Sequence, residues 1–280
     1  MKLKDLARKL TQDGDNFIKE HGSANFHEFA HQALIKHGPE KLLNLDELKN
    51  YIFETDSMKI QNFRSLEFSD LPVTLSRGKF CFIDIYVWQR RPTVIHNHHF
   101  SGAFMGLLGN NVDLEFEFHE KRSIGNFHAL GNLTLRHERV LSPGDAVPIA
   151  PLDGFIHQNH HEADLTVNMC FRTPELSEKN LSNYLYTGLR YEKDPELLAR
   201  SSYLMRLLQL GETPVKDFNL SIDDALTFVL ENHNLKIGNP RFQETLSFLL
   251  EKIEKEAGLD LPQLIREHDQ RFEEFIDSYE

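Results

Sequence analysis

Cysteine is scarce in this chain of 280 residues, which contains only Cys81 and Cys170. Two cysteines build neither a disulfide framework nor a cysteine-based zinc site, so a reducing cytoplasm is the expected compartment. Long apolar runs are missing too, since no stretch approaches the roughly 18 residues that a membrane-spanning helix needs. The first ten residues, MKLKDLARKL, predict an amphipathic helix rather than a secretory signal.

Positive charge is also in short supply. The chain has 31 Lys and Arg against 43 Asp and Glu, which gives a net charge of -12 with His neutral. An acidic surface repels the phosphates of nucleic acids and of anionic lipids, so we expect neither nucleic acid nor membrane as a partner. The hydrophobic fraction of 40% is enough for a sizeable core in one or two domains. A homo-oligomer is compatible with this composition.

The hydrophobic pattern divides the chain into three zones. Residues 1–69 have the spacing of helices. Residues 70–175 contain short stretches in which apolar and polar residues alternate, such as LEFEFH at 114–119, separated by turn residues; this is typical of a β-sandwich or barrel. Residues 176–280 return to helical spacing. We therefore predict an α+β fold in which a β-barrel stands between N-terminal and C-terminal helices. The helices expected in the last zone are 179–189, 195–210, 221–233, 241–257 and 262–279.

Histidine, by contrast, is abundant, with fifteen residues, and many of them lie in the barrel zone. His96 and His98 are two positions apart on a predicted strand, so their side chains point to the same face. Two imidazoles on one face are a natural pair of ligands for a single metal ion. Further along the chain, a turn, a strand and Gly154 lead to a third candidate, His157.

Neighbouring histidines compete for these places. His99 points to the opposite face of a regular strand, but a β-bulge would exchange it with His98. His160 or His161 could take the place of His157, because all three belong to one short run. The other histidines of this zone are expected to be surface residues or hydrogen-bonded core residues: His119, His128 and His137.

The two histidine segments resemble the two motifs of the cupin superfamily, and the resemblance covers the middle of the chain only. The matching residues are His96-Asn97-His98 and Gly109 in the first motif, and Pro143-Gly144-Asp145, Pro151, Gly154 and His157 in the second. The resemblance implies a cupin-type β-barrel, also called a jelly roll or double-stranded β-helix. It also implies that His96, His98 and His157 bind one divalent metal ion.

Within the cupins, the metal motif is most similar to the cysteine dioxygenase-like branch of thiol dioxygenases. Most cupins have a metal-ligating Glu shortly after the second His, whereas residues 100–103 here are Phe-Ser-Gly-Ala. Three neutral imidazoles then leave coordination positions open for substrate and O₂. The segment HERVLSPGDAVPI at 137–149 is similar to the branch's strand before the last ligand. A Tyr that the branch carries on the last strand is replaced here by Phe171.

This resemblance implies a non-haem iron(II) oxygenase or dioxygenase, an oxidoreductase that acts on a small polar substrate such as a thiol. Iron(II) is the expected cofactor, with zinc, nickel or manganese as alternatives. Arg90 and Arg91 are the expected substrate-binding residues, with Arg77 as a third candidate by position, because Arg pairs with a carboxylate through two hydrogen bonds. The alternative function is a non-oxidative metal-binding cupin, which would be an isomerase, a hydrolase or a module that senses a ligand or metal.

Overall fold

The structure is a computed structural model, and it describes residues 1–61, 69–89, 92–175, 181–210, 218–235 and 240–278. The chain forms two compact units. The first consists of Met1–Phe116 and Leu135–Lys179 and contains both histidine segments; the second consists of Glu117–Thr134 and Asn180–Glu280. The three zones of the sequence were defined by hydrophobic pattern, whereas the two units are defined by compactness. The division into three zones therefore stays a prediction.

Five antiparallel strands form the first sheet, and all of them belong to the first unit. All five come from residues 70–175, the zone in which the sequence alternates. In spatial order the strands are β1 (Leu71–Arg77), β2 (Phe82–Gln89), β9 (Leu165–Arg172), β4 (Gly102–Leu108) and β7 (Ala146–Ile149).

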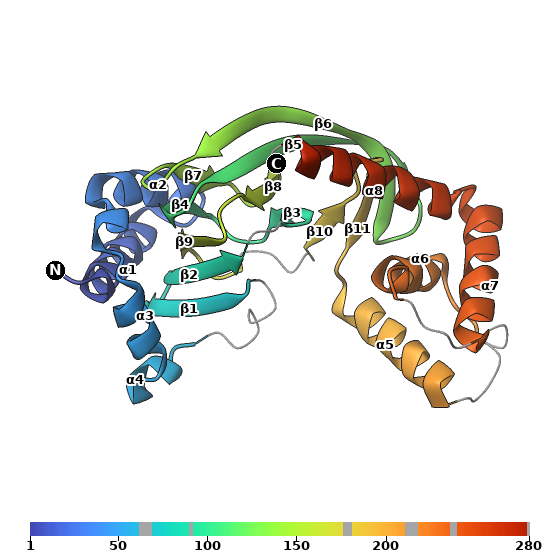
Figure 1. The fold of residues 1–280 in the computed structure, drawn as a ribbon, viewed down its shortest axis with the longest axis horizontal. Coiled ribbons are helices and arrows are strands. Elements are labelled where there is room, and N and C mark those ends of the chain that lie inside the picture. The colour runs from blue at the N-terminus through green and yellow to red at the C-terminus, as the bar shows by residue number, and fades with distance from the viewer. Residues whose placement is uncertain (62–68, 90–91, 176–180, 211–217, 236–239, 279–280) are drawn as a thin grey trace. The chain divides into compact units, whose positions relative to one another are not determined.

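Both faces of this sheet are buried, and alternation along β9 explains how. Val167, Met169 and Phe171 point to one face, where they join a core covered by α1 (Leu3–His21) and α2 (Phe26–His37), as Figure 1 shows. The residues between them point to the opposite face and help to line a cavity. Because successive strand residues face opposite sides, one strand serves the helix-covered core and the cavity at once.

The helices predicted for the N-terminal zone are present. After α1 and α2 follow a short 3₁₀ helix (Pro39–Leu42), α3 (Leu45–Ile52) and α4 (Thr55–Met58). Gly38 ends α2 in the left-handed conformation, with φ of 54°, which glycine adopts without strain. Asn44 begins α3, where its side-chain oxygen accepts hydrogen bonds from the backbone N–H groups of Asp46 (3.0 Å) and Glu47 (3.1 Å).

We expect Asn44→Ala to lower the free energy of unfolding by about 1 kcal/mol, because an N-cap side chain satisfies backbone donors that otherwise have no helical partner. Urea unfolding followed by circular dichroism measures the difference. Asn25→Ala is the matched control, since Asn25 stands at the same position before α2 but its side chain makes no capping hydrogen bond. Equal losses in the two variants would contradict the prediction.

Six strands form a second sheet, which closes as a barrel. The α+β fold class predicted from the sequence, with a central barrel between N-terminal and C-terminal helices, is confirmed. The strands, in spatial order, are β10 (Ser182–Tyr184), β11 (Leu189–Glu192), β6 (His128–Leu141), β5 (Asn111–Ser123), β8 (Leu152–His161) and β3 (Ile95–His98).

The second unit has its own apolar core, built mainly from four helices. At α6, Ser221 is the N-cap, and its hydroxyl accepts a hydrogen bond from the N–H of Asp224. The helix expected over 179–189 is wrong: the described residues from 181 onward form β10, a turn and the start of β11. Gly188 in that turn has φ of 83°, a conformation that ends regular structure. The four helices are α5 (Pro195–Leu210), α6 (Ile222–Asn232), α7 (Pro240–Ala257) and α8 (Leu261–Asp277).

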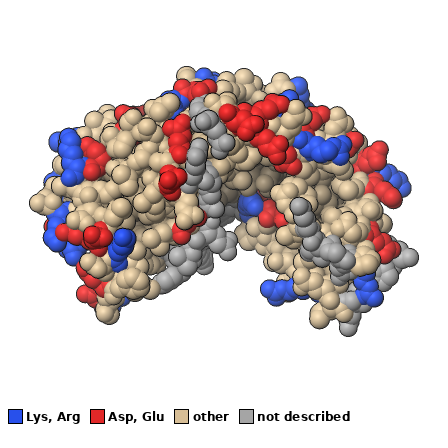
Figure 2. Space-filling model, in the orientation of Figure 1, with Lys and Arg blue, Asp and Glu red and all other residues tan. Residues whose placement is uncertain are grey.

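Two surface properties bear on the expected partners. None of the helices in the described part of the chain is long and apolar enough to cross a membrane. On the face drawn in Figure 2, acidic and basic side chains are interspersed. The exclusion of nucleic acid and of membrane surfaces as partners therefore stays a prediction from net charge.

Candidate metal centre

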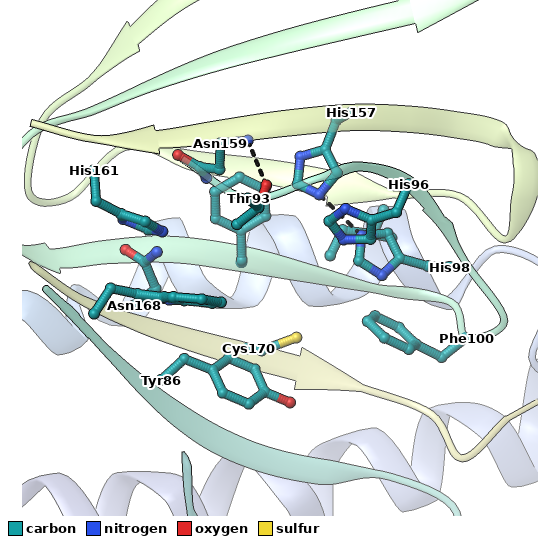
Figure 3. A pocket seen from close by; sticks show the side chains of 13 residues that line it. Tyr86, Thr93, His96, His98, Phe100, His157, Asn159, His161, Asn168 and Cys170 are labelled. Atoms are coloured by element: carbon teal, nitrogen blue, oxygen red, sulfur yellow. Dashed lines mark hydrogen bonds between the residues drawn. The ribbon is translucent and has the colours of Figure 1, made fainter. Parts of the chain in front are cut away.

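The three predicted metal ligands lie together inside the first unit (Figure 3). His96 and His98 are on β3, His157 is on the neighbouring strand β8, and His96 is the direct cross-strand partner of His157. One candidate ligand atom from each residue lies within 4.8 Å of the other two, and all three side chains are buried. The register of the two strands shifts between His96 and His98, so a bulge is present, yet His98 keeps its place in the cluster.

Hydrogen bonds at the outer nitrogens determine how two of the rings are protonated. Nδ1 of His96 lies 2.8 Å from the carbonyl oxygen of Val94, and Nδ1 of His157 lies 2.7 Å from a carboxylate oxygen of Asp113. Carbonyl and carboxylate oxygens only accept hydrogen bonds, so both Nδ1 atoms carry the proton. A neutral imidazole has one N–H, and the lone pairs therefore reside on Nε2 of His96 and His157. Nε2 is the nitrogen that these two residues have available for a metal ion.

The third ring completes the set. Nε2 of His98 lies 3.0 Å from Nε2 of His157. Two nitrogens that bind one ion at about 2.1 Å and at a right angle to each other are about 3.0 Å apart, so this separation suits a shared ion. Neutral imidazoles bind iron(II), zinc, nickel and manganese, and the donor set does not choose among them.

Burial keeps His96 and His98 neutral. Loss of hydration, and to a smaller degree the neighbouring His157, lower the pKa of His96 to about 3. Burial also lowers the pKa of His98 well below its usual range, helped by the other two imidazoles and by Arg172. At neutral pH both rings are therefore unprotonated, which is the form that binds a metal ion.

A charged network orients His157 from outside the cluster. The Asp113 side chain is fully buried, and besides its bond to His157 its second oxygen accepts a hydrogen bond of 2.9 Å from Nε of Arg139. Another nitrogen of Arg139 donates to Glu115 at 2.6 Å. Carboxylates behind metal-binding histidines fix the ring and its tautomer, and this is the role that the geometry gives to Asp113.

We expect Asp113→Asn to weaken metal affinity by roughly 10- to 100-fold, because a neutral amide holds the His157 N–H less firmly than a carboxylate does. Competition with a metal-binding dye measures the affinity. Glu115→Gln is the matched control, since the Glu115 carboxylate accepts a hydrogen bond from the same Arg139, while Glu115 pairs with His157 across the strands through the backbone. An unchanged metal affinity in Asp113→Asn would show that Asp113 does not orient His157 for metal binding.

The imidazole cluster lines a small cavity of about 50 Å³. Aromatic side chains form much of its wall, among them Tyr86 and Trp88 on β2. Thr93, Asn159 and Asn168 supply polar groups, and the residues that the structure describes in this wall include no Asp, Glu, Lys or Arg. The cavity therefore suits a small molecule with an uncharged body.

Tyr86 brings to this cavity a hydroxyl that sequence reasoning looked for at Phe171. Phe171 instead points into the helix-covered core, where its ring meets Phe26 edge-on at 5.0 Å. The Tyr86 hydroxyl donates to Asp84 at 3.3 Å, and the same carboxylate oxygen accepts 2.8 Å from Nε of Arg172. The alternation of FIDIYVW was the available signal, since it places Asp84, Tyr86 and Trp88 on one face.

The other predicted residues lie elsewhere. Arg90 and Arg91, the predicted substrate-binding residues, fall outside the described residues. Arg77 is exposed at the end of β1, with its guanidinium carbon 5.0 Å from the centre of the Phe82 ring, and it does not line the cavity. His99 and His160 are buried outside the cluster, and His161 lines the cavity without joining it. His119 and His137 are exposed, and His128 is buried and hydrogen-bonded to Asp223, as expected for these three residues.

No protein-family model and no curated protein matches the chain. Solved structures do resemble part of it. A cupin-2 domain protein from Rhodospirillum rubrum is 14% identical over 50% of this chain and 77% of its own, with a TM-score of 0.29. A sugar phosphate isomerase from a cupin superfamily, from Silicibacter pomeroyi, is 14% identical over 49% and 85%, with a TM-score of 0.29. A cupin superfamily protein from Desulfitobacterium hafniense is 12% identical over 37% and 74%, with a TM-score of 0.25.

These neighbours are cupins by name. None of the three is described as a thiol dioxygenase, so that branch stays a prediction. Because identity and TM-score are both low, the functional argument depends on the contacts within this chain alone.

Proposed function

We propose that this chain is a metal-dependent cupin in which His96, His98 and His157 bind one divalent ion, with iron(II) as the favoured metal. The observation that carries the proposal is the direction of the nitrogen lone pairs. His96 and His157 donate hydrogen bonds from Nδ1 to fixed acceptors and so keep Nε2 for a ligand, and Nε2 of His98 lies 3.0 Å from Nε2 of His157. Hydrogen bonds of this kind, behind the metal-binding nitrogens, are characteristic of metal sites in proteins.

The proposed activity is oxidation of a small polar substrate, a thiol among the candidates, by O₂. An iron(II) ion held by neutral ligands would supply positive charge and open coordination positions for substrate and oxygen. The chain's own contribution is the largely aromatic wall of the cavity, together with the amides of Asn159 and Asn168, which can hydrogen-bond a substrate. Size favours a small substrate, since the cavity measures about 50 Å³.

Anaerobic loading with iron(II), followed by oxygen-consumption assays over a panel of small thiols, tests this activity. We expect one iron per chain and oxygen uptake with at least one thiol. Tight iron binding without oxygen uptake on any thiol would exclude a thiol as the substrate. Failure to bind iron would exclude the oxygenase function.

A non-oxidative cupin is the second candidate, and the cavity contains an observation in its favour. Besides the metal-binding cluster it contains His161, a further imidazole that can move protons, as isomerases and hydrolases require. Zinc, nickel or manganese would serve such chemistry. Metal analysis of protein purified without added metal discriminates the two, because predominant iron favours oxygen chemistry and predominant zinc, nickel or manganese favours the alternative.

A further inference from the structure

His161 lies at the end of β8, in the same cavity as the imidazole cluster but separate from it (Figure 3). Its ring is stacked on the indole of Trp88, with ring centres 4.7 Å apart and planes 16° from parallel. The residue is 1% exposed. A ring held this firmly has a fixed direction, so the positions of its two nitrogens can be read from their partners.

The partners of Nδ1 define the tautomer of His161. Nδ1 lies 2.6 Å from the side-chain oxygen of Asn111, its direct cross-strand partner, and 2.7 Å from the hydroxyl of Thr166. The amide nitrogen of Asn111 donates to the side-chain oxygen of Asn168 at 3.2 Å, which turns the Asn111 oxygen toward the imidazole. Nδ1 is therefore the N–H donor, and Nε2 carries the lone pair.

The other titratable groups of the cavity are poor proton acceptors. Burial raises the pKa of the Cys170 thiol to about 12 and the pKa of Tyr86 well above its usual range, so both keep their protons. His96, His98 and His157 direct their nitrogens toward one another.

Among the residues that the structure describes, the strands packed around His161 contribute uncharged side chains to the cavity. β5 contributes Asn111, β9 contributes Thr166 and Asn168, and β2 contributes Trp88. The described cavity wall contains no carboxylate either. The lone pair of His161 is thus the acceptor best suited to a proton released inside the cavity.

We propose that His161 accepts the proton of a small weak acid, such as a thiol, when the anion of that acid binds at the imidazole cluster. The S–H bond breaks, the proton bonds to Nε2 of His161, and sulfur keeps the electron pair with which it binds the metal. The cavity gains a neutral molecule, so its total charge does not change. This inference rests on the proposed function, because it requires a metal ion at the cluster.

The test uses the full chain loaded with cobalt(II) and titrated with 2-mercaptoethanol, whose binding is followed through the absorption of cobalt. In weakly buffered solution a pH indicator counts the protons released. We expect no proton release from the parent protein and an affinity that does not change with pH near neutrality. His161→Gln should release one proton for each thiol bound, and its affinity should then rise tenfold for each unit of pH.

His137→Gln is the control, because His137 is an exposed histidine of the same unit; it should behave as the parent does. One proton released by the parent would overturn the role of His161 without any variant. The same pH dependence in the parent and in His161→Gln, with cobalt bound in both, would also overturn it while leaving the metal site intact. Failure of the parent to bind cobalt would overturn the proposed function itself.

Discussion

Replacing His96 and His98 together by alanine is expected to abolish metal binding, so that protein loaded with iron(II) and desalted carries less than a tenth of the metal of the parent. The double variant leaves His157 as a single imidazole in an apolar wall, and one neutral ligand does not hold a divalent ion against water. Elemental analysis after desalting measures the metal content, and circular dichroism checks that the variant is folded.

The matched control replaces two exposed histidines, His119 and His137, by alanine. It removes the same number of imidazoles and should leave the metal content unchanged. Full metal content in the variant at His96 and His98 would place the metal elsewhere and would remove the proposed function. Loss of metal in both variants would indicate binding to surface histidines in general.

Arg172→Leu is expected to lower the free energy of unfolding by about 3–5 kcal/mol, the cost of leaving a charge buried without its partner. Arg172 lies between the rings of Phe82 and Phe100, each with its centre 5.2 Å from the guanidinium carbon, and pairs with the buried carboxylate of Asp84. Without Arg172, the hydrogen-bond donors that remain to Asp84 among the described residues are the hydroxyls of Thr74 and Tyr86. Chemical unfolding in urea gives the difference.

Arg77→Leu is the matched control, because Arg77 also lies over the Phe82 ring but is exposed at the end of β1. It should cost less than 1 kcal/mol, as ordinary surface substitutions do. Replacing both partners, Arg172→Met with Asp84→Asn, should recover much of the lost stability, since it removes both charges and keeps an acceptor for the two hydroxyls. A double variant as unstable as Arg172→Leu would show that the charge pair is not the cause.

Local pattern was enough to predict the fold class and the pairing of His96 with His98 on one face of a strand. Alternation along a strand is set by two neighbouring residues, so the shared direction of His96 and His98 is a property of the sequence itself. The approach of His157 came from the resemblance of its segment to the second cupin motif, and the pairing of β3 with β8 is what brings it opposite His96. Fold class followed from the same alternation, because many short strands with turns between them have few architectures available.

The rest of the site depends on which strands are neighbours, and no local pattern contains that information. Tyr86 and Trp88 on β2 share a cavity with His161 on β8, two strands that belong to different sheets. The helix expected over 179–189 failed for a related reason. Apolar residues such as Leu181, Tyr184 and Leu185 fit a helix or a strand about equally over so short a run, and pairing of β10 with β11 decided the outcome.

The two-sided burial of β9 restricts how the sequence of this strand can change. A shift of its pairing by one residue would carry Phe171 into the cavity and bring Asn168 and Cys170 beneath the helices, leaving polar groups in an apolar core. The pairing of β9 that places its apolar residues against the helices therefore also places the residues between them in the cavity wall. The cavity should therefore be preformed in the metal-free protein, so that metal binding would not require the cavity wall to rearrange.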